Sequence, residues 1–195
     1  MNTVKPIILA SRSPRRIQLL RQIGLSFTAQ ESGVDEYIAD GTSPEEAVRK
    51  LSLEKADHVA RRLRNGIVIG ADTIVVLHGE ILGKPSSKED AVSMLSKLGG
   101  KTHTVFTGFA LVDAESKKSY VDHEQTEVTF RELGKEEIKR YVESGSPMDK
   151  AGAYGIQDDY GAVFVERING CFYTVVGFPL SKFYSALNLF LEESK

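Results

Sequence analysis

The most apolar run of the chain reads Ile67-Val-Ile-Gly-Ala-Asp-Thr-Ile-Val-Val76. Its β-branched residues predict a strand that is buried on both faces at the centre of a sheet. Strand-like and helix-like segments alternate through the first half of the chain, which indicates an α/β fold built in layers. The length of 195 residues allows one large core or two lobes that share a cleft. Because no repeat, low-complexity tract or proline-rich linker divides the chain, we predict one domain over residues 1–195 with two lobes.

The remaining elements are predicted from periodicity and from capping residues. Ser43-Pro-Glu-Glu46 has the form of a capping box with proline at the first helical position, so a long helix is expected to follow it. Ser87, with Asp90 three residues later, can cap another helix that is expected to end near Gly99-Gly100. Strands are expected at 6–10, 103–112 and 119–130, and further helices at 14–23, 135–144 and 178–193. Asn169-Gly170 predicts a hairpin turn that joins a strand at 161–168 to one at 171–176.

The composition is that of an ordinary globular protein, with 41% hydrophobic and 27% charged residues and a formal net charge of −2. This charge gives no overall attraction for nucleic acid or for an anionic membrane, so neither is expected as a partner. The apolar stretch before Ser11 is too short for a signal peptide, and no run approaches the roughly 18 apolar residues of a membrane span. The single cysteine, Cys171, is expected to be a buried, inert thiol in a strand. These observations predict a soluble, cytoplasmic protein.

A second segment, Ser11-Arg-Ser-Pro-Arg-Arg16, follows the strand expected at 6–10 and opens a helix. Ser13 is expected to be the N-cap and Pro14 the first helical residue, so that Arg15 and Arg16 fill the first turn. The helix dipole disfavours cations there by roughly a few tenths of a kcal/mol, which suggests that an external anion such as phosphate binds at this end. The alternative is a capped helix with two solvated arginines.

One carboxylate, Asp72, interrupts the apolar run. An isolated buried charge costs several kcal/mol, so Asp72 must be paired, solvated in a cleft or bound to a cation. The small residues Gly70 and Ala71 would let a ligand approach the backbone, and Thr73 adds a hydroxyl. Asp72 would suit hydrolysis of a phosphoanhydride, either as a general base or as a Mg²⁺ ligand. The alternative is a structural aspartate that accepts backbone hydrogen bonds at the end of a strand.

Two further segments carry polar residues in less distinctive settings. Gly83-Lys-Pro85 places Lys84 in a tight turn from which its side chain could return toward Asp72, although most lysines in such turns are solvated. The stretch Lys150-Ala-Gly-Ala-Tyr-Gly-Ile-Gln157 matches neither the P-loop nor the dinucleotide pattern. Its small residues permit close approach of the backbone, Lys150 offers a charge, and the Gln157 amide can read a base edge. The alternative for this stretch is an ordinary glycine-rich connection.

Other types of site find little support. Glu36 follows an extended segment and could add a carboxylate to the cleft, and Lys55 projects from the long helix. The four histidines show no metal-ligand spacing, and neither a nucleophile elbow nor a Cys/His pair is present. The sequence therefore contains no recognisable nucleophile motif for covalent catalysis. Aromatic residues do not alternate with basic clusters, so a nucleic-acid surface is poorly supported.

Taken together, four motifs resemble the Maf family of nucleoside triphosphate pyrophosphatases in their order and spacing. They are Ala10-Ser-Arg-Ser-Pro-Arg-Arg16, Gly70-Ala-Asp-Thr73, Gly83-Lys-Pro85 and Asp149-Lys-Ala-Gly-Ala-Tyr-Gly-Ile-Gln157. The resemblance runs over nearly the whole chain. It implies a Maf/ITPase-like α/β fold in which an elongated mixed β-sheet is flanked by helices, with a central cleft between two lobes, often as a homodimer. It also implies a divalent cation, Mg²⁺ or Mn²⁺, and hydrolysis of a nucleoside triphosphate between the α and β phosphates to a monophosphate and pyrophosphate.

The functional residues of the family carry over to this chain position by position. The resemblance implies that Asp72 is the catalytic base. Asp72 and Glu36 are the candidate metal ligands, and Asp72 is considered as base, as metal ligand or as both. It places substrate-binding residues at Ser11, Arg15, Arg16, Glu36, Lys55, Thr73, Lys84, Lys150 and Gln157. The combination of Arg15, Thr73 and Gln157 resembles the subgroup that acts on dTTP and UTP, including modified pyrimidine nucleotides. This combination does not resemble the subgroup that prefers 7-methyl-GTP.

Two functions are therefore considered. In the first, a pyrimidine nucleoside triphosphate pyrophosphatase, Asp72 activates a water in line with the leaving pyrophosphate while Gln157 and Thr73 select the base. The second is a nucleotide-binding regulator of cell division or septum formation that acts through a partner protein. A pure sensor need not retain Asp72, which argues for the enzyme.

Overall fold

The computed structural model describes residues 5–157 and 160–193, and within them the chain forms two compact units. The first unit contains the described residues up to Asp72, then Thr107–Glu124, then those from Gly177 onward. The second unit contains Thr73–Phe106 and Gln125–Val176. Each unit is therefore built from segments that lie far apart in the sequence. The expectation of one domain with a cleft between two lobes stays a prediction.

The first unit is organised around short and long strands. Its strand order is β2-β1-β3-β5-β6, with bounds Thr28–Ala29, Ile7–Leu9, Ile67–Leu77, Thr102–Asp113 and Ser119–Phe130. The strand β1 runs parallel to both β2 and β3. The apolar run that predicts a central strand is β3, which has neighbours on both sides and is buried along nearly its whole length.

The second unit continues β3, β5 and β6 and adds two antiparallel pairs. The strand β4 (Glu80–Leu82) pairs with β3, and β7 (Val165–Asn169) pairs with β6. Parallel and antiparallel pairs thus occur in one sheet with helices packed on it. This arrangement confirms the predicted α/β class with a mixed sheet.

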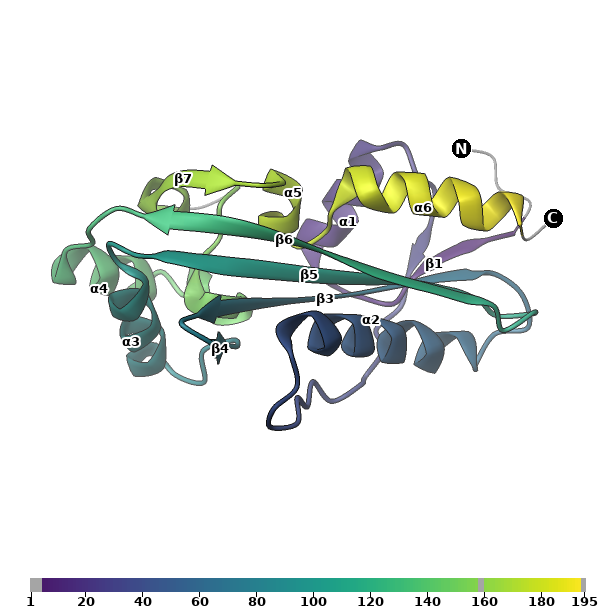
Figure 1. The fold of residues 1–195 in the computed structure, drawn as a ribbon, viewed down its shortest axis with the longest axis horizontal. Coiled ribbons are helices and arrows are strands. Elements are labelled where there is room, and N and C mark those ends of the chain that lie inside the picture. The colour runs from purple at the N-terminus through teal and green to yellow at the C-terminus, as the bar shows by residue number, and fades with distance from the viewer. Residues whose placement is uncertain (1–4, 158–159, 194–195) are drawn as a thin grey trace. The chain divides into compact units, whose positions relative to one another are not determined.

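Helices cover both faces of the sheet in the first unit (Figure 1). The helix α2 (Pro44–Ala60) lies on one face, and α1 (Pro14–Gln22) and α6 (Leu180–Glu192) lie on the other. The predicted capping box of α2 is present: Ser43 Oγ accepts a hydrogen bond from the Glu46 N–H at 3.3 Å, and the Glu46 carboxylate accepts one from the Ser43 N–H. Among the described residues, no helix combines the length and apolar character needed to cross a membrane.

Two glycines let α2 lie directly against the strands. A Cβ atom on Gly70 of β3 would stand 2.0 Å from the Ser52 carbonyl oxygen, and one on Gly108 of β5 would stand 2.3 Å from the Val48 carbonyl oxygen. Both distances are too short for any side chain, so only glycine permits this helix position. Gly70 therefore makes room for α2 and not, as its small size suggested, for a ligand.

The opposite face of the sheet is anchored by aromatic residues. Phe109 of β5 contacts Phe178 and Phe183, with ring centroids 6.4 and 5.7 Å away, and the latter two rings are 4.7 Å apart. All three rings are fully buried. Such edge and tilted contacts add to the hydrophobic stabilisation of the buried rings, so this cluster holds α6 against the sheet.

The second unit has an apolar core of its own beneath α3 (Lys88–Leu98) and α4 (Lys135–Glu143). Leu95, Tyr141 and Phe164 are among its buried members. Ser87 caps α3 as predicted, because its Oγ accepts a hydrogen bond from the Asp90 N–H at 3.1 Å. Short 3-10 turns follow at Ser146–Asp149, Ala151–Ala153 and Tyr160–Phe164.

The hairpin predicted at Asn169-Gly170 is wrong in its second arm, and its first arm, expected at 161–168, becomes a strand only from Val165. The strand β7 ends at Asn169, but the next element is a short helix, α5 (Phe172–Val176). The side chain of Thr126 on β6 explains the change: its Oγ1 accepts a hydrogen bond from the Cys171 N–H at 2.9 Å and donates one to the Cys171 carbonyl at 3.0 Å. Both backbone groups of Cys171 are thereby used, so no strand ladder starts there. Cys171 itself is partly exposed and not, as expected, buried in a strand.

Two polar side chains, those of His103 and Tyr154, contact each other in the core of the second unit. His103 of β5 is 2% exposed, and its Nε2 lies 2.8 Å from the hydroxyl oxygen of Tyr154. Within the described residues, His103 Nδ1 is buried and has no hydrogen-bond partner. Burial lowers the pKa of His103 from 6.5 to about 4, so His103 is neutral at physiological pH.

Acidification is expected to destabilise the protein through His103. Between pH 6.5 and 4 the unfolded chain binds a proton at this position and the folded chain does not, so the free energy of unfolding falls as the pH drops. The full effect, reached near pH 4, is about 3 kcal/mol. Urea unfolding at pH 7 and pH 4.5 should show a larger loss in the wild type than in His103→Gln.

A matched control is His78→Gln, because His78 is exposed in the β3–β4 turn. This variant should keep the pH dependence of the wild type. If His103→Gln and the wild type lost the same stability between the two pH values, the proposed role of His103 would be wrong.

Candidate functional site

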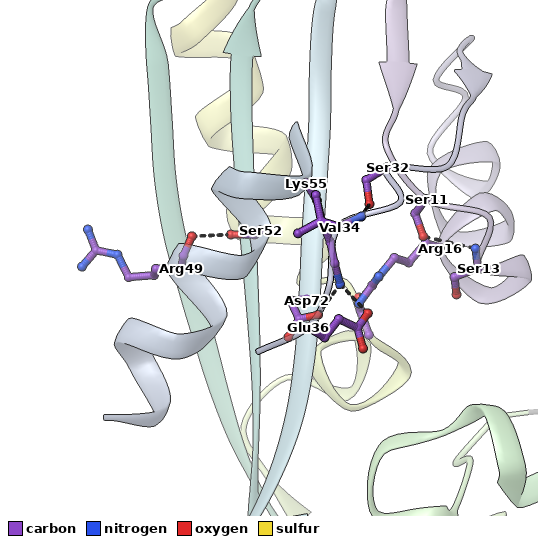
Figure 2. A network of polar contacts seen from close by, with 11 residues as sticks. Ser11, Ser13, Arg16, Ser32, Val34, Glu36, Arg49, Ser52, Lys55 and Asp72 are labelled. Atoms are coloured by element: carbon purple, nitrogen blue, oxygen red, sulfur yellow. Dashed lines mark hydrogen bonds and ion pairs between the residues drawn. The ribbon is translucent and has the colours of Figure 1, made fainter. Parts of the chain in front are cut away.

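The centre of the candidate site is a buried ion-pair cluster in the first unit. Lys55 Nζ donates hydrogen bonds to Asp72 Oδ1 at 2.5 Å and to Glu36 Oε1 at 2.7 Å (Figure 2). The side chains of Lys55 and Asp72 are each 7% exposed, whereas that of Glu36 is 42% exposed. Asp72 is thus a paired carboxylate, as its place inside an apolar strand requires.

Three different segments supply these side chains. Asp72 comes from β3, Lys55 from α2, and Glu36 from the irregular segment between β2 and α2. The close contact of α2 with β3 at Gly70 involves Ser52 and Ala56, the latter next to Lys55 in the helix. The packing of the helix on the strand therefore determines how far the Lys55 ammonium lies from Asp72.

The start of α1 lies near this cluster. Ser13 is the N-cap residue and Pro14 the first helical residue, as predicted, but the Ser13 side chain makes no capping hydrogen bond. The Ser13 N–H instead donates to Ser11 Oγ at 3.1 Å. Figure 2 shows Arg16 reaching from α1 toward Glu36 and Asp72.

Arg16 is positioned by a backbone hydrogen bond and lies among charged side chains. Its Nε donates a hydrogen bond to the Gly177 carbonyl at 3.0 Å. Burial lowers the pKa of the Arg16 guanidinium below its ordinary value; the charge of Asp72 opposes this effect, and that of Arg15 adds to it. Since a guanidinium stays protonated in proteins, the two neighbouring arginines favour the entry of an anion.

The candidate residues of the second unit are placed by a loop contact. The Gly152 N–H donates a hydrogen bond to the Gly83 carbonyl at 3.0 Å, so the glycine-rich stretch lies beside the turn that carries the exposed Lys84. Lys150 is buried, and its Nζ donates to the Ser146 carbonyl at 2.5 Å and to Asp149 Oδ1 at 2.9 Å. These contacts stabilise the local turn.

Gln157 stands out by its missing contacts. Among the described residues, neither its side-chain oxygen nor its side-chain nitrogen has a hydrogen-bond partner, and both atoms are buried. Buried amides are nearly always satisfied, so this one is available to a ligand that offers a donor and an acceptor. Thr73, the other expected base-selecting residue of this unit, directly follows Asp72 in β3.

The carboxylate pair fits a divalent cation. In the described ranges, no group of three or more His, Cys, Asp and Glu side chains is gathered as a metal site. Asp72 and Glu36 nevertheless place one oxygen each around a single cationic atom, Lys55 Nζ. Mg²⁺ is usually held by one or two carboxylates together with water and substrate phosphates, and these two residues could supply that protein share.

Three features of the site lie beyond what the sequence patterns predict. The Gly177 carbonyl that accepts from Arg16, the helix contact at Gly70 and the bridging position of Lys55 all depend on segments distant in the chain. Of these, only Lys55 carries a sequence signal, a cation on the long helix that the family resemblance marks.

Comparison with known proteins shows which family this chain resembles. The family model described as "Maf-like protein" matches residues 6–190. A protein of Desulforamulus reducens named "dTTP/UTP pyrophosphatase" is 50% identical over 187 residues, which cover 96% of this chain and 97% of that protein. A protein of Thermotoga maritima with the same name is 52% identical over 183 residues, 93% of this chain and 87% of that one. A solved HAM1 protein from Coxiella burnetii is 17% identical, with a TM-score of 0.45 over 65% of this chain and 73% of that one.

Proposed function

Because the chain belongs to the Maf family, we propose that the cluster of Asp72, Lys55, Glu36 and Arg16 is the catalytic centre of a nucleotide hydrolase. The chain is a nucleoside triphosphate pyrophosphatase that acts on the pyrimidine nucleotides dTTP and UTP, the activity for which its relatives of about half identity are named. The observation that carries the assignment of the centre is the buried Asp72 carboxylate held by Lys55.

In the proposed reaction, Asp72 accepts a proton from a water molecule whose oxygen attacks the α phosphorus. The bond between the α phosphorus and the bridging oxygen breaks, and pyrophosphate leaves with the electron pair. Arg15, Arg16 and Lys84 bind the phosphates and stabilise the charge that develops on them. A divalent cation, when bound, neutralises part of that charge. The products are a nucleoside monophosphate and pyrophosphate.

Selection of the base is proposed to rest on Gln157 and Thr73. The Gln157 amide, buried and without a hydrogen-bond partner among the described residues, supports this role, since it offers both a donor and an acceptor to a pyrimidine edge. A site built to hydrogen-bond a base rejects analogues that leave its polar groups unpaired. Ser11, Glu36 and Lys150 complete the proposed set of substrate contacts.

Several broader expectations remain proposals. We propose Mg²⁺ or Mn²⁺ as the cation, with Asp72 and Glu36 as its ligands, a homodimer as the assembly and the cytoplasm as the location. No specific observation favours a regulator of septum formation that acts through a partner protein, and the contacts of Asp72 and Glu36 with Lys55 support the hydrolase.

A panel of nucleotides tests the proposed reaction and the role of Gln157 together. With Mg²⁺ or Mn²⁺, the wild type is expected to release pyrophosphate from dTTP and UTP faster than from ATP or GTP. Gln157→Leu should lower kcat/KM for dTTP by about 10–100-fold, the effect of one or two lost hydrogen bonds in a buried site. The readout is pyrophosphate and orthophosphate measured separately for each nucleotide.

Gln125→Leu is the control for the panel, since Gln125 is exposed on β6 and should leave the preference for dTTP unchanged. Orthophosphate as the primary product would indicate cleavage at the γ phosphate and defeat the proposed reaction. An unchanged preference in Gln157→Leu would defeat the assignment of Gln157 alone.

A further inference from the structure

The Lys55 ammonium occupies the point at which the two carboxylates of the site meet. It lies 2.5 Å from Asp72 Oδ1 and 2.7 Å from Glu36 Oε1. A divalent cation bound to the same two oxygens would lie about 2.0–2.6 Å from each, depending on the ion. Lys55 and the metal would therefore compete for the same two oxygen atoms.

The carboxylates of the cluster already have cationic neighbours without any ligand. Arg16 and Lys55 carry two positive charges against the two negative charges of Glu36 and Asp72, and Arg15 beside Arg16 adds a third positive charge. A divalent cation that entered alone would meet this positive charge, and carboxylates that are already bound by an ammonium. A triphosphate that entered alone would meet the same two carboxylates. The cation offsets the carboxylate charge that repels the triphosphate, and the triphosphate offers the site's positive groups an anionic partner when the cation binds.

Lys55 has the chemistry to change partners. A lysine side chain has four rotatable methylene groups and three donors that bind as a point charge, so its ammonium can move by several ångströms without a backbone change. Triphosphate oxygens offer it a new anionic partner. Only 7% of the Lys55 side chain is exposed, so the motion is confined to the end of the side chain.

We propose that Lys55 is an exchangeable internal counter-ion: it fills the cation position between Asp72 and Glu36 in the nucleotide-free protein and transfers to the phosphates when metal and nucleotide enter together. The proposal rests on the proposed function, because it takes a triphosphate as the second ligand. It gives Lys55 a role beyond phosphate binding. Lys55 suppresses binding of metal to the empty site and makes metal and nucleotide bind cooperatively.

The cooperativity must be reciprocal. If nucleotide raises the affinity for metal by some factor, metal raises the affinity for nucleotide by the same factor. Removing the Lys55 charge should raise the affinity of the empty site for metal and reduce this factor. If Lys55 only binds phosphate, removing its charge should leave the affinity for metal unchanged in the absence of nucleotide.

The test is Mn²⁺ binding to the nucleotide-free protein, followed by the electron paramagnetic resonance signal of free Mn²⁺. Lys55→Met is expected to bind Mn²⁺ at least tenfold more tightly than the wild type. A non-hydrolysable dUTP analogue should tighten Mn²⁺ binding strongly in the wild type and much less in Lys55→Met. The matched control is Lys50→Met on the same helix, whose side chain is 58% exposed and pairs with Glu54.

Two further variants keep the result decisive. Because Lys55→Met removes the ammonium that binds both carboxylates, its thermal midpoint should be lower than that of the wild type without Mn²⁺ and should rise more on Mn²⁺ addition. If Lys55→Met does not fold, Lys55→Gln supplies the same comparison with a neutral donor. In the double variant with Asp72→Asn, the gain in Mn²⁺ affinity should disappear, which assigns it to this site.

The proposal would be overturned if Lys55→Met, or Lys55→Gln in its place, bound Mn²⁺ no more tightly than the wild type. It would also be overturned if nucleotide tightened Mn²⁺ binding equally in the variant and the wild type. Both readings are independent of turnover. Failure of the proposed function would instead appear as an absence of pyrophosphate release by the wild type.

Discussion

Asp72→Asn is expected to lower the rate of pyrophosphate release from dTTP by about 10²–10⁴-fold, the range typical for loss of a general base. The amide has nearly the shape of the carboxylate, so α2 and β3 should keep their positions, but it cannot accept a proton from water. Release of pyrophosphate at saturating dTTP measures the effect. Thermal unfolding of the same sample shows whether the variant is folded.

Asp113→Asn is the matched control for this variant. Asp113 is a second buried aspartate of the first unit, and its Oδ2 accepts a hydrogen bond from Lys5 Nζ at 2.8 Å. Its substitution should reduce stability while the turnover of the folded protein stays near that of the wild type. If Asp72→Asn kept wild-type turnover, Asp72 would not be the base.

Gly70→Ala is expected to have the largest effect on stability. Its Cβ would stand 2.0 Å from the Ser52 carbonyl oxygen and 2.8 Å from the Ala56 nitrogen, and both atoms belong to backbone that cannot rotate away. Overpacking of this kind costs about 3 kcal/mol or more, because α2 must move off the sheet. Lys55 would move with the helix, and a displacement of about 1 Å can lower turnover by about 10²-fold.

Two other glycines separate these effects. Gly108→Ala meets α2 at Val48, farther along the helix from Lys55, so it should destabilise the protein with a smaller loss of turnover. Gly99→Ala makes only an ordinary contact at 3.4 Å with Leu133 and should change stability by about 1 kcal/mol or less. Chemical unfolding and turnover at a temperature where all variants are folded would show the ranking. A Gly70→Ala protein as stable and as active as the wild type would contradict the proposed helix contact.

Local signals in the sequence predict most of the elements. The capping box at Ser43 and the Ser87 cap place the starts of α2 and α3, because the groups that satisfy the free N–H donors lie within three residues. The apolar run that becomes β3 is equally local. The arm expected at 171–176 is different, because Thr126, 45 residues earlier in the chain, binds both backbone groups of Cys171. Such a contact has no local pattern.

Some features of the candidate site can likewise be predicted from the sequence, and others depend on the fold. The motifs around Arg16 and Asp72 can be found in the sequence, and the fold brings Arg16, Glu36, Lys55 and Asp72 together. Their roles stay predictions until the variants are measured. The sequence does not predict that Lys55 bridges Asp72 and Glu36, because this contact depends on how closely α2 approaches β3. That the buried Gln157 amide lacks a hydrogen-bond partner within residues 5–157 and 160–193 likewise becomes visible only once the fold is known.

The division of the chain into interleaved segments has a consequence for its synthesis. On the ribosome, the residues up to Asp72 emerge first, but the Phe109 cluster that closes their unit needs Phe178 and Phe183, which emerge near the end. The second unit also waits, since Gln125–Val176 completes it. Neither unit therefore has all its segments while the chain is half made, in contrast to proteins whose first domain is complete before the next is translated. Until residue 113 has emerged, the apolar strand β3 has β1 on one side but lacks β5 on the other, and a chaperone that binds short apolar segments would have this strand as a target in that interval.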